Sequence, residues 1–241
     1  MRGRRLFSYR GGIVLNFFYD GAVIVMLLGM LGCQNNTEST PMVDNGHYLH
    51  EEVSTTIFWV GEDASAENGY IANHDSAWDV RWMEHYGGVD SPDQRSGYYP
   101  AAFVPMENPF YFALPYTDFD PGGRKQSAYD RIPWSNEKAV WPDDESMCKN
   151  RWIMIIKGTR IAYAQWEDAG PFESDDVDYV FGTDEPLNTI NGSAGLDVSP
   201  AVRDYLGLSD IDVVDWMFVE EEDVPDGPWK QLVTDSMITW Y

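Results

Sequence analysis

Two aspartates stand where predicted strands end, and side chains at strand ends can face a binding cleft. Asp168 closes "AYAQWEDAGPF" just before Gly170 and Pro171, and Asp197 follows an apolar stretch in "AGLDVSPAVRDYLGL". A pair of carboxyl groups can cleave a glycosidic bond at a separation of about 5–5.5 Å with retention or about 6.5–9.5 Å with inversion. Asp168 and Asp197 are therefore the candidate catalytic pair.

Local backbone structure offers a second interpretation of the same two residues. Asp168 can cap its own Gly-Pro turn, and Asp197 can bind backbone amides at the start of the helix that follows it. The helix dipole would favour the ionised form of Asp197, which suits a base better than an acid. The sequence leaves the catalytic and the structural interpretation open.

Aromatic residues are abundant, at 15% of the chain. Most must fill the interior of a small domain, because large rings supply most of its buried apolar surface. Two tryptophans lie in proline-rich loops, which favours a role in stacking against sugars. The predicted ligand-binding residues are Trp134, Trp141, Trp166 and Tyr111.

No cofactor or metal site is expected. Asp118 and Asp120 begin a calcium-like pattern, but Gly122 replaces the third ligand and no glutamate follows at the twelfth position. The four histidines show no spacing typical of metal ligands. Cys148 is interpreted as a small core residue, since no histidine lies near it in the sequence.

Short strands dominate the pattern around these residues. Two strands joined around residues 157–160 account for "NRWIMIIKGTRIAYAQWED". Ser199 is a natural helix N-cap, Pro200 suits the first helical position, and Gly207 ends the helix. Further strands are expected in residues 54–61, 109–118, 194–198 and 212–220. This pattern predicts a mainly β fold, a small closed barrel with one or two short helices and long loop insertions.

Three motifs in this order resemble the double-psi β-barrel superfamily, which includes rare lipoprotein A, expansins and barwin-like endoglucanases. They are Asp168-Ala169-Gly170-Pro171, Leu196-Asp197-Val198-Ser199 and the strand "VDWMFV". The resemblance spans about residues 54–229 and implies a six-stranded double-psi barrel that acts on polysaccharides.

One departure from that family bears on activity. Rare lipoprotein A cleaves peptidoglycan with a histidine and an upstream acid, but here Tyr111 and Phe112 occupy the region of that histidine, and Glu107 is the nearest upstream acid. We therefore expect polysaccharide binding without strong catalysis. The alternative is a glycan-cleaving enzyme that uses Asp168 and Asp197.

The N-terminal residues are typical of an export signal. Four arginines precede an apolar run of 11 residues, Ala22 to Gly32, which is too short for a membrane-spanning helix. "MLGC" resembles a bacterial lipobox, which implies cleavage before Cys33, acylation of its thiol with chains such as palmitate, and an outer-membrane location. A signal-anchor helix is the alternative. We expect a signal peptide over residues 1–32, a disordered tether over 33–52 and the barrel domain over 53–241.

The negative net charge limits the classes of partner that the protein can bind. The net charge is −24, and removal of residues 1–32, with four basic residues and one acidic residue, changes it to −27. Such a polyanion repels nucleic acid. The expected partners are a cell-wall or other polysaccharide, and the membrane through a lipid anchor. The domain is expected to be a monomer.

Overall fold

The structure is a computed structural model that describes residues 18–19, 22–23, 47–66 and 68–240. The chain divides into two units, Met1–Glu38 and Ser39–Tyr241. In the first unit, strands β1 (Phe18–Tyr19) and β2 (Ala22–Val23) form an antiparallel pair. The predicted lipidation residue, Cys33, lies outside the described residues. Within the described part, no helix has the length and apolar character needed to cross a membrane.

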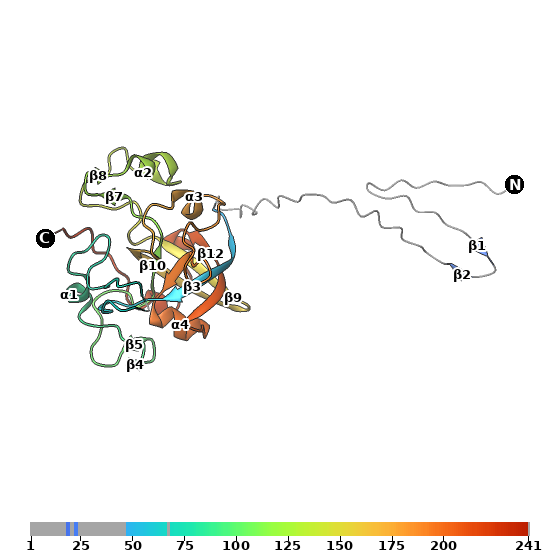
Figure 1. Ribbon diagram of the computed structural model, residues 1–241, viewed down its shortest axis with the longest axis horizontal. Coiled ribbons are helices and arrows are strands. Elements are labelled where there is room, and N and C mark those ends of the chain that lie inside the picture. The colour runs from blue at the N-terminus through green and yellow to red at the C-terminus, as the bar shows by residue number, and fades with distance from the viewer. Residues whose placement is uncertain (1–17, 20–21, 24–46, 67, 241) are drawn as a thin grey trace. The chain divides into compact units, whose positions relative to one another are not determined.

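The second unit is built on a closed barrel of six strands, which confirms the predicted mainly β barrel (Figure 1). Around the barrel the strands follow the order β10-β6-β11-β3-β12-β9. In chain order they are β3 (His50–Ile57), β6 (Tyr111–Leu114), β9 (Trp152–Lys157), β10 (Arg160–Ala169), β11 (Leu196–Val198) and β12 (Ile211–Val219).

The barrel mixes parallel and antiparallel pairing. β10 runs parallel to β6, and β11 runs parallel to β3, whereas the other four neighbouring pairs are antiparallel. β9 and β10 form the predicted hairpin, and Gly158 in its turn has a φ of 59°, which glycine adopts without steric cost. Parallel neighbours need long connections, and these connections carry the loop insertions.

Large side chains fill the interior of the barrel. Trp166 and Phe112 stack with ring centroids 5.9 Å apart, and Phe218 lies 5.8 Å from Trp166. Trp216 and Ile155 are fully buried beside them. At about 25 cal/mol per Å² of apolar surface, rings of this size dominate the free energy of folding. Since the described part contains a single cysteine, Cys148, this packing holds the domain without a disulfide.

Four short helices accompany the barrel, where one or two were expected. They are α1 (Trp82–Tyr86), α2 (Gln126–Arg131), α3 (Val177–Val180) and α4 (Pro200–Leu206). α4 matches the prediction at both ends: the Ser199 hydroxyl accepts from the Val202 amide, and Gly207 ends the helix with a φ of 73°. Helices as short as α2 and α3 complete too few turns for an apolar period to reveal them in the sequence.

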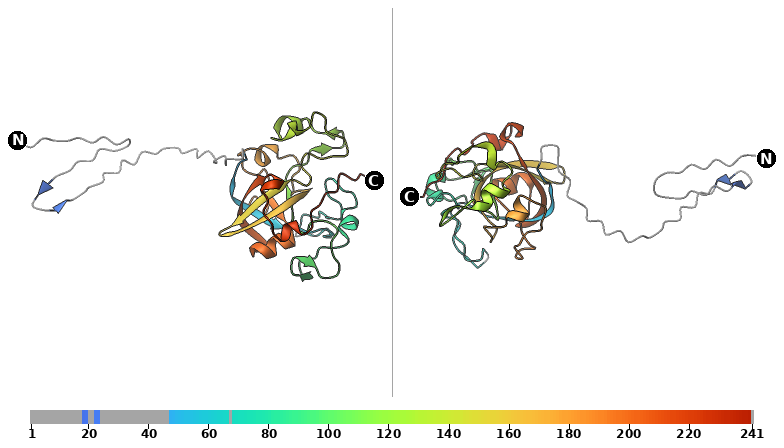
Figure 2. Two further views of the ribbon diagram at one scale, coloured as in Figure 1. Left: turned by 180° about the vertical axis from the view of Figure 1, so that it is seen from behind. Right: turned by 90° about the horizontal axis from the view of Figure 1, so that it is seen from above.

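The loop insertions contain two small hairpins and three 3-10 turns beside the barrel (Figure 2). These elements are β4 (Arg95–Ser96) with β5 (Tyr99–Pro100), β7 (Phe119–Asp120) with β8 (Gly123–Arg124), and the turns Ser135–Glu137, Glu221–Asp223 and Pro228–Lys230.

The barrel domain starts earlier than predicted. β3 begins at His50 rather than near Val53, and both His47 and His50 are buried. The His50 ring stacks on Trp216 at 4.0 Å with an interplanar angle of 5°. The polar composition of residues 47–52 concealed this packing, so that part of the predicted tether belongs to the fold.

A buried carboxylate, Asp118, ties the insertions together. It accepts hydrogen bonds from Trp78 Nε1 at 2.9 Å, Ser146 Oγ at 2.7 Å and the Met147 amide at 2.7 Å. Arg124 Nη1 forms a buried ion pair with it at 2.8 Å. These four contacts satisfy the carboxylate inside the protein and join three insertion segments.

We expect Asp118→Ala to lower the free energy of unfolding by about 3–5 kcal/mol, because it leaves the buried Arg124 guanidinium without its partner. The matched control is Asp120→Ala, which removes an exposed carboxylate whose hydrogen bond to the described residues is the one from the Gly122 amide, at 2.6 Å. Denaturant titration measures both variants. Equal losses of stability in the two would contradict a central role for Asp118.

Candidate functional site

The two predicted aspartates lie in one row across the barrel wall. Asp168 of β10 and Asp197 of β11 are both in register with Ala113 of β6, the strand between them. Neighbouring strands are about 4.8 Å apart, so the two aspartate Cα atoms lie roughly 9–10 Å from each other with their side chains on one face. Ala113, whose side chain is a single methyl group, lies between the two aspartates in this row.

A β-bulge in β10 puts Asp168 on this face. The register shifts between Trp166, which pairs with Phe112, and Asp168, which pairs with Ala113. Successive residues of a strand point to opposite faces, so Phe112 and Ala113 face opposite ways. The extra residue, Glu167, therefore allows Trp166 to point into the barrel core while Asp168 points to the other face.

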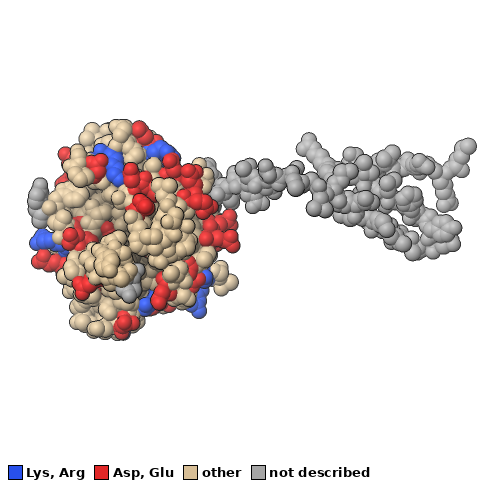
Figure 3. Space-filling view, in the orientation of Figure 1, with Lys and Arg blue, Asp and Glu red and all other residues tan. Residues whose placement is uncertain are grey.

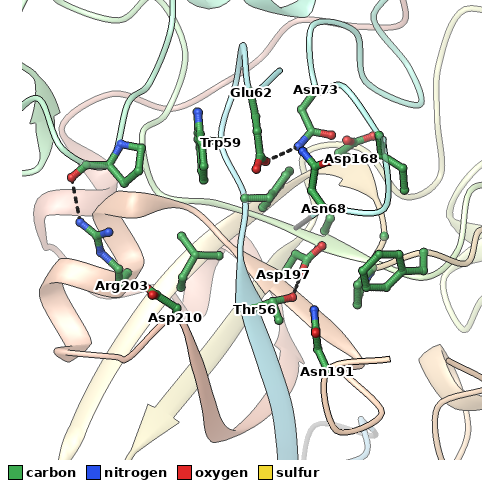
Figure 4. A pocket seen from close by; sticks show the side chains of 18 of the residues that line it. Thr56, Trp59, Glu62, Asn68, Asn73, Asp168, Asn191, Asp197, Arg203 and Asp210 are labelled. Atoms are coloured by element: carbon green, nitrogen blue, oxygen red, sulfur yellow. Dashed lines mark hydrogen bonds between the residues drawn. The ribbon is translucent and has the colours of Figure 1, made fainter. Parts of the chain in front are cut away.

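A cavity of about 450 Å³ opens at this row (Figure 4). The end of β3, the segment that follows it, and the ends of β10 and β11 supply most of its wall. Its polar and charged lining residues are Thr56, Glu62, Asn68, Asn73, Asp93, Asp168, Asn191, Asp197, Arg203 and Asp210. Trp59, partly exposed, lines the cavity with them. The predicted pair thus shares the kind of concave site that binds ligands.

Asp168 combines a backbone role with access to the cavity. Its Oδ1 accepts from the Ala77 amide at 2.7 Å and the Ala169 amide at 2.8 Å. Burial raises its pKa to about 7; the two amides oppose this rise, and the charge of Asp197 adds to it. Oδ2 accepts no hydrogen bond from the part of the chain that the structure describes. That oxygen can exchange a proton with a ligand.

Asp197 carries a proton more readily than the sequence suggested. Its pKa is raised to about 7 mainly by burial; a hydrogen bond from the Thr56 hydroxyl to Oδ1 opposes this rise, and the charge of Glu62 adds to it. The α4 cap is Ser199, so Asp197 does not serve the helix terminus. Desolvation thus acts against the ionised form that the helix dipole was expected to favour.

Glu62 is a third carboxyl group in the cavity, and the sequence analysis did not identify it. Its Oε2 accepts a hydrogen bond from Asn73 Nδ2 at 2.8 Å. The backbone amide of Asn73 also donates a hydrogen bond to the Glu62 carbonyl at 2.9 Å. Burial raises the Glu62 pKa, and hydrogen bonds from Asn68 and Asn73 oppose the rise. Glu62 follows the end of a predicted strand, as Asp168 ends one, and that shared position could have revealed it.

The four predicted sugar-stacking residues are all buried, and none of them lines the cavity. Trp134 Nε1 donates to the Met147 carbonyl at 2.6 Å, and Trp141 Nε1 donates to the Ser135 carbonyl at 2.8 Å. The proline-rich loops fold onto the barrel and make these rings part of its core. Tyr111 donates its hydroxyl to Asp90 at 2.9 Å, and Trp166 lies inside the barrel. The aromatic residues that line the cavity are Phe58, Trp59 and Phe172.

The remaining reactive residues lie elsewhere or are inert. Glu107 is buried and accepts from Ser236 Oγ at 2.9 Å, and it is not part of the cavity lining. Cys148 is buried and burial raises the pKa of its thiol, which agrees with a core residue. Among the described residues no group of three or more His, Cys, Asp or Glu side chains is placed to hold a metal ion.

A comparison with protein-family models found no match to this chain, and a comparison with curated protein sequences found no similar protein. The closed six-stranded barrel is therefore the level at which the fold is shown. The double-psi type and the kinship with rare lipoprotein A stay predictions from the three sequence motifs.

We expect the free energy of unfolding to fall as the pH rises from about 4 to about 7. In this interval the folded state holds a proton on Asp197 that the unfolded state has lost, because the pKa is about 7 in the fold against 3.8 in the free side chain. Asp197→Asn should reduce this slope and raise stability at pH 8 by more than about 1 kcal/mol relative to wild type.

The control for this prediction is Asp226→Asn, which removes an exposed carboxylate far along the chain from the cavity residues. Denaturant titrations at pH 4, 6 and 8 give the slope for each variant. A slope that is identical in wild type and Asp197→Asn would contradict the raised pKa.

Proposed function

We propose that this protein binds a polysaccharide at the cavity and cleaves a glycosidic bond with Asp197 as the acid and Asp168 as the base. The observation that carries the proposal is the pair of carboxyl groups that flank Ala113 in one cavity, each with a pKa raised to about 7. A catalytic acid works best when its pKa lies near the operating pH.

Hydrogen bonding divides the two roles. Asp168 receives two backbone amide hydrogen bonds, which stabilise the charged form that a base needs. Asp197 receives only one hydroxyl hydrogen bond to stabilise its charged form, and the charge of Glu62 favours its protonated form. This reverses the roles expected from the helix dipole alone.

The reaction follows from these roles. Asp197 transfers its proton to the bridging oxygen as the bond from that oxygen to the anomeric carbon breaks. Asp168 accepts the proton of the attacking water, so the products are two shorter sugar chains. A Cα separation of roughly 9–10 Å leaves room for a water molecule between the carboxyl groups, as an inverting enzyme requires. In a lytic reaction the attacking group would be a hydroxyl of the sugar itself.

The rest of the cavity wall suits an uncharged sugar. Three amide side chains, those of Asn68, Asn73 and Asn191, offer donors and acceptors to hydroxyl groups, and Trp59 offers an aromatic surface. Acidic side chains are dispersed over the visible face of the domain, with few basic ones among them (Figure 3). This distribution repels nucleic acid and strongly anionic polymers.

The proposed setting is the outer membrane, with the domain held by a lipid on Cys33. It rests on the arginine-rich N-terminus, the short apolar run and the "LGC" sequence. The resemblance to rare lipoprotein A supports this location and favours peptidoglycan as the substrate class.

Binding without cleavage is the second candidate function. The region where the related family carries its histidine holds Tyr111 and Phe112, and both side chains are fully buried. A barrel that lacks this group could retain a glycan and leave it intact. Incubation with substrate separates the two functions.

Incubation of the purified domain with peptidoglycan and β-glucans should release shorter chains, detected by mass spectrometry. We expect Asp197→Asn and Asp168→Asn to lower the rate by about 10²–10⁴-fold, because each removes one side of acid–base catalysis. Asp226→Asn, an exposed change, should keep the full rate. Retention of the polysaccharide without any product would establish the binding function instead, and the absence of both would refute a polysaccharide ligand.

For the lipid anchor, we expect Cys33→Ser to move the protein from the membrane fraction to the soluble fraction without unfolding the barrel, because the acylated thiol is lost. Fractionation with labelled fatty acid measures this change, and circular dichroism checks the fold. Membrane retention of the variant, with no label in either form, would disprove acylation.

A further inference from the structure

Glu62 has no role in the two-carboxylate reaction, although it lies in the same cavity. Its side chain is only 8% exposed. Figure 4 shows Glu62 and Asp197 entering the cavity from opposite sides, with Asn68 and Asn73 beside Glu62. A buried carboxyl group that faces a catalytic acid changes how readily that acid loses its proton.

The Glu62 carboxyl group is held in place by its neighbours. Glycine at position 61 adopts a φ of 77° and donates its amide to the Asn73 carbonyl at 2.7 Å. Asn73 donates two hydrogen bonds to Glu62, from its backbone amide to the Glu62 carbonyl and from its Nδ2 to the Glu62 carboxylate. Three hydrogen bonds thus lock the loop, so Glu62 keeps its position relative to the strands below.

We propose that Glu62 is a positioning residue that keeps the proton on Asp197, so that Asp197 enters the reaction as the acid. This inference rests on the proposed function for its consequence in catalysis. Its electrostatic part concerns Glu62 and Asp197 alone and can be measured without a substrate.

Hydrogen bonds influence which of the two carboxyl groups, Glu62 or Asp197, loses its proton first. Asn73 presents an amide donor to Glu62 at 2.8 Å, and a donor of this kind stabilises the charged carboxylate. Asn68 lies beside Glu62 and adds to the same effect on its pKa. Asp197 has one hydroxyl donor, from Thr56. The first carboxylate to form is therefore that of Glu62, and its negative charge raises the pKa of Asp197 beyond the effect of burial.

The other charged groups of the cavity do not replace Glu62 in this role. Asp168, beyond Ala113, carries the same sign of charge and acts in the same direction. Asp93 and Asp210 are exposed to solvent, which screens their charges. The guanidinium of Arg203 donates to Asp204 at 2.8 Å and to the Pro92 carbonyl at 3.0 Å, so a neighbouring carboxylate outside the cavity lining compensates its charge.

The test is Glu62→Gln, which keeps the size of the side chain and an oxygen that can accept from Asn73. The pKa of Asp197, measured by carbon NMR of the carboxyl group, should fall by about one unit. The alkaline limb of kcat/KM against pH should move to lower pH by the same amount. The matched control is Asp63→Asn, which removes one charge at the neighbouring, exposed residue and should shift neither quantity.

The outcomes separate the inference from the proposed function. An unchanged Asp197 pKa in Glu62→Gln overturns the inference, whether or not the protein cleaves a glycan. A lowered pKa supports it, even if the wild type releases no product and the proposed function fails. If Glu62→Gln does not fold, titration of the wild type decides: Glu62 must lose its proton before Asp197, and the opposite order overturns the inference.

Discussion

The single extra residue in β10 is the constraint on which both the core and the cavity depend. With a regular alternation, Trp166 and Asp168 would share one face, and either a carboxylate would enter the barrel or a tryptophan would leave it. The bulge at Glu167 lets the ring stack on Phe112 and the carboxylate join the cavity. Glu167 is itself buried, and Lys149 Nζ binds its carboxylate at 2.6 Å. A strand that must bend at one position therefore provides an ion pair, a packed core and a reactive side chain within three consecutive residues.

The position of the aromatic residues follows from the small size of the barrel. A barrel of six short strands encloses little volume, and the rings of its own strands do not cover its outer surface. The insertions add the cover, and their tryptophans pack inward, with polar indole atoms bonded to nearby carbonyl groups. The cavity is lined by carboxylates, amides and apolar side chains, and Trp59 and Phe172 are the partly exposed rings among them. Both hydrogen bonds and ring contacts are therefore available to a ligand at this surface.

Local signals allowed parts of this fold to be predicted. Ser199, Pro200 and Gly207 mark both ends of α4, and the alternation around Gly158 marks a hairpin, because caps and turns depend on a few adjacent residues. The two aspartates were also recognised, since each stands at a strand end. The features that the sequence could not show depend on burial by segments far away in the chain. For example, the Ala77 amide donates a hydrogen bond to Asp168, which lies 91 residues later. The proton affinity of Asp197, the inward orientation of Trp134 and the packing of His50 have the same origin.

Ala113 lies between the two aspartates, and its side chain extends no further than a single methyl group. A Cβ placed on Gly170 would come within 3.4 Å of Asp197 Oδ2 and 3.9 Å of the Ala113 Cβ. Two residues with almost no side chain thus lie next to each other beside the carboxyl pair. A chain with a bulky residue at either position could keep both aspartates and the whole barrel and yet have no space between the carboxyl groups. Among chains with this fold, the size of these two small residues would therefore separate barrels that can admit a ligand from barrels that only retain the shape.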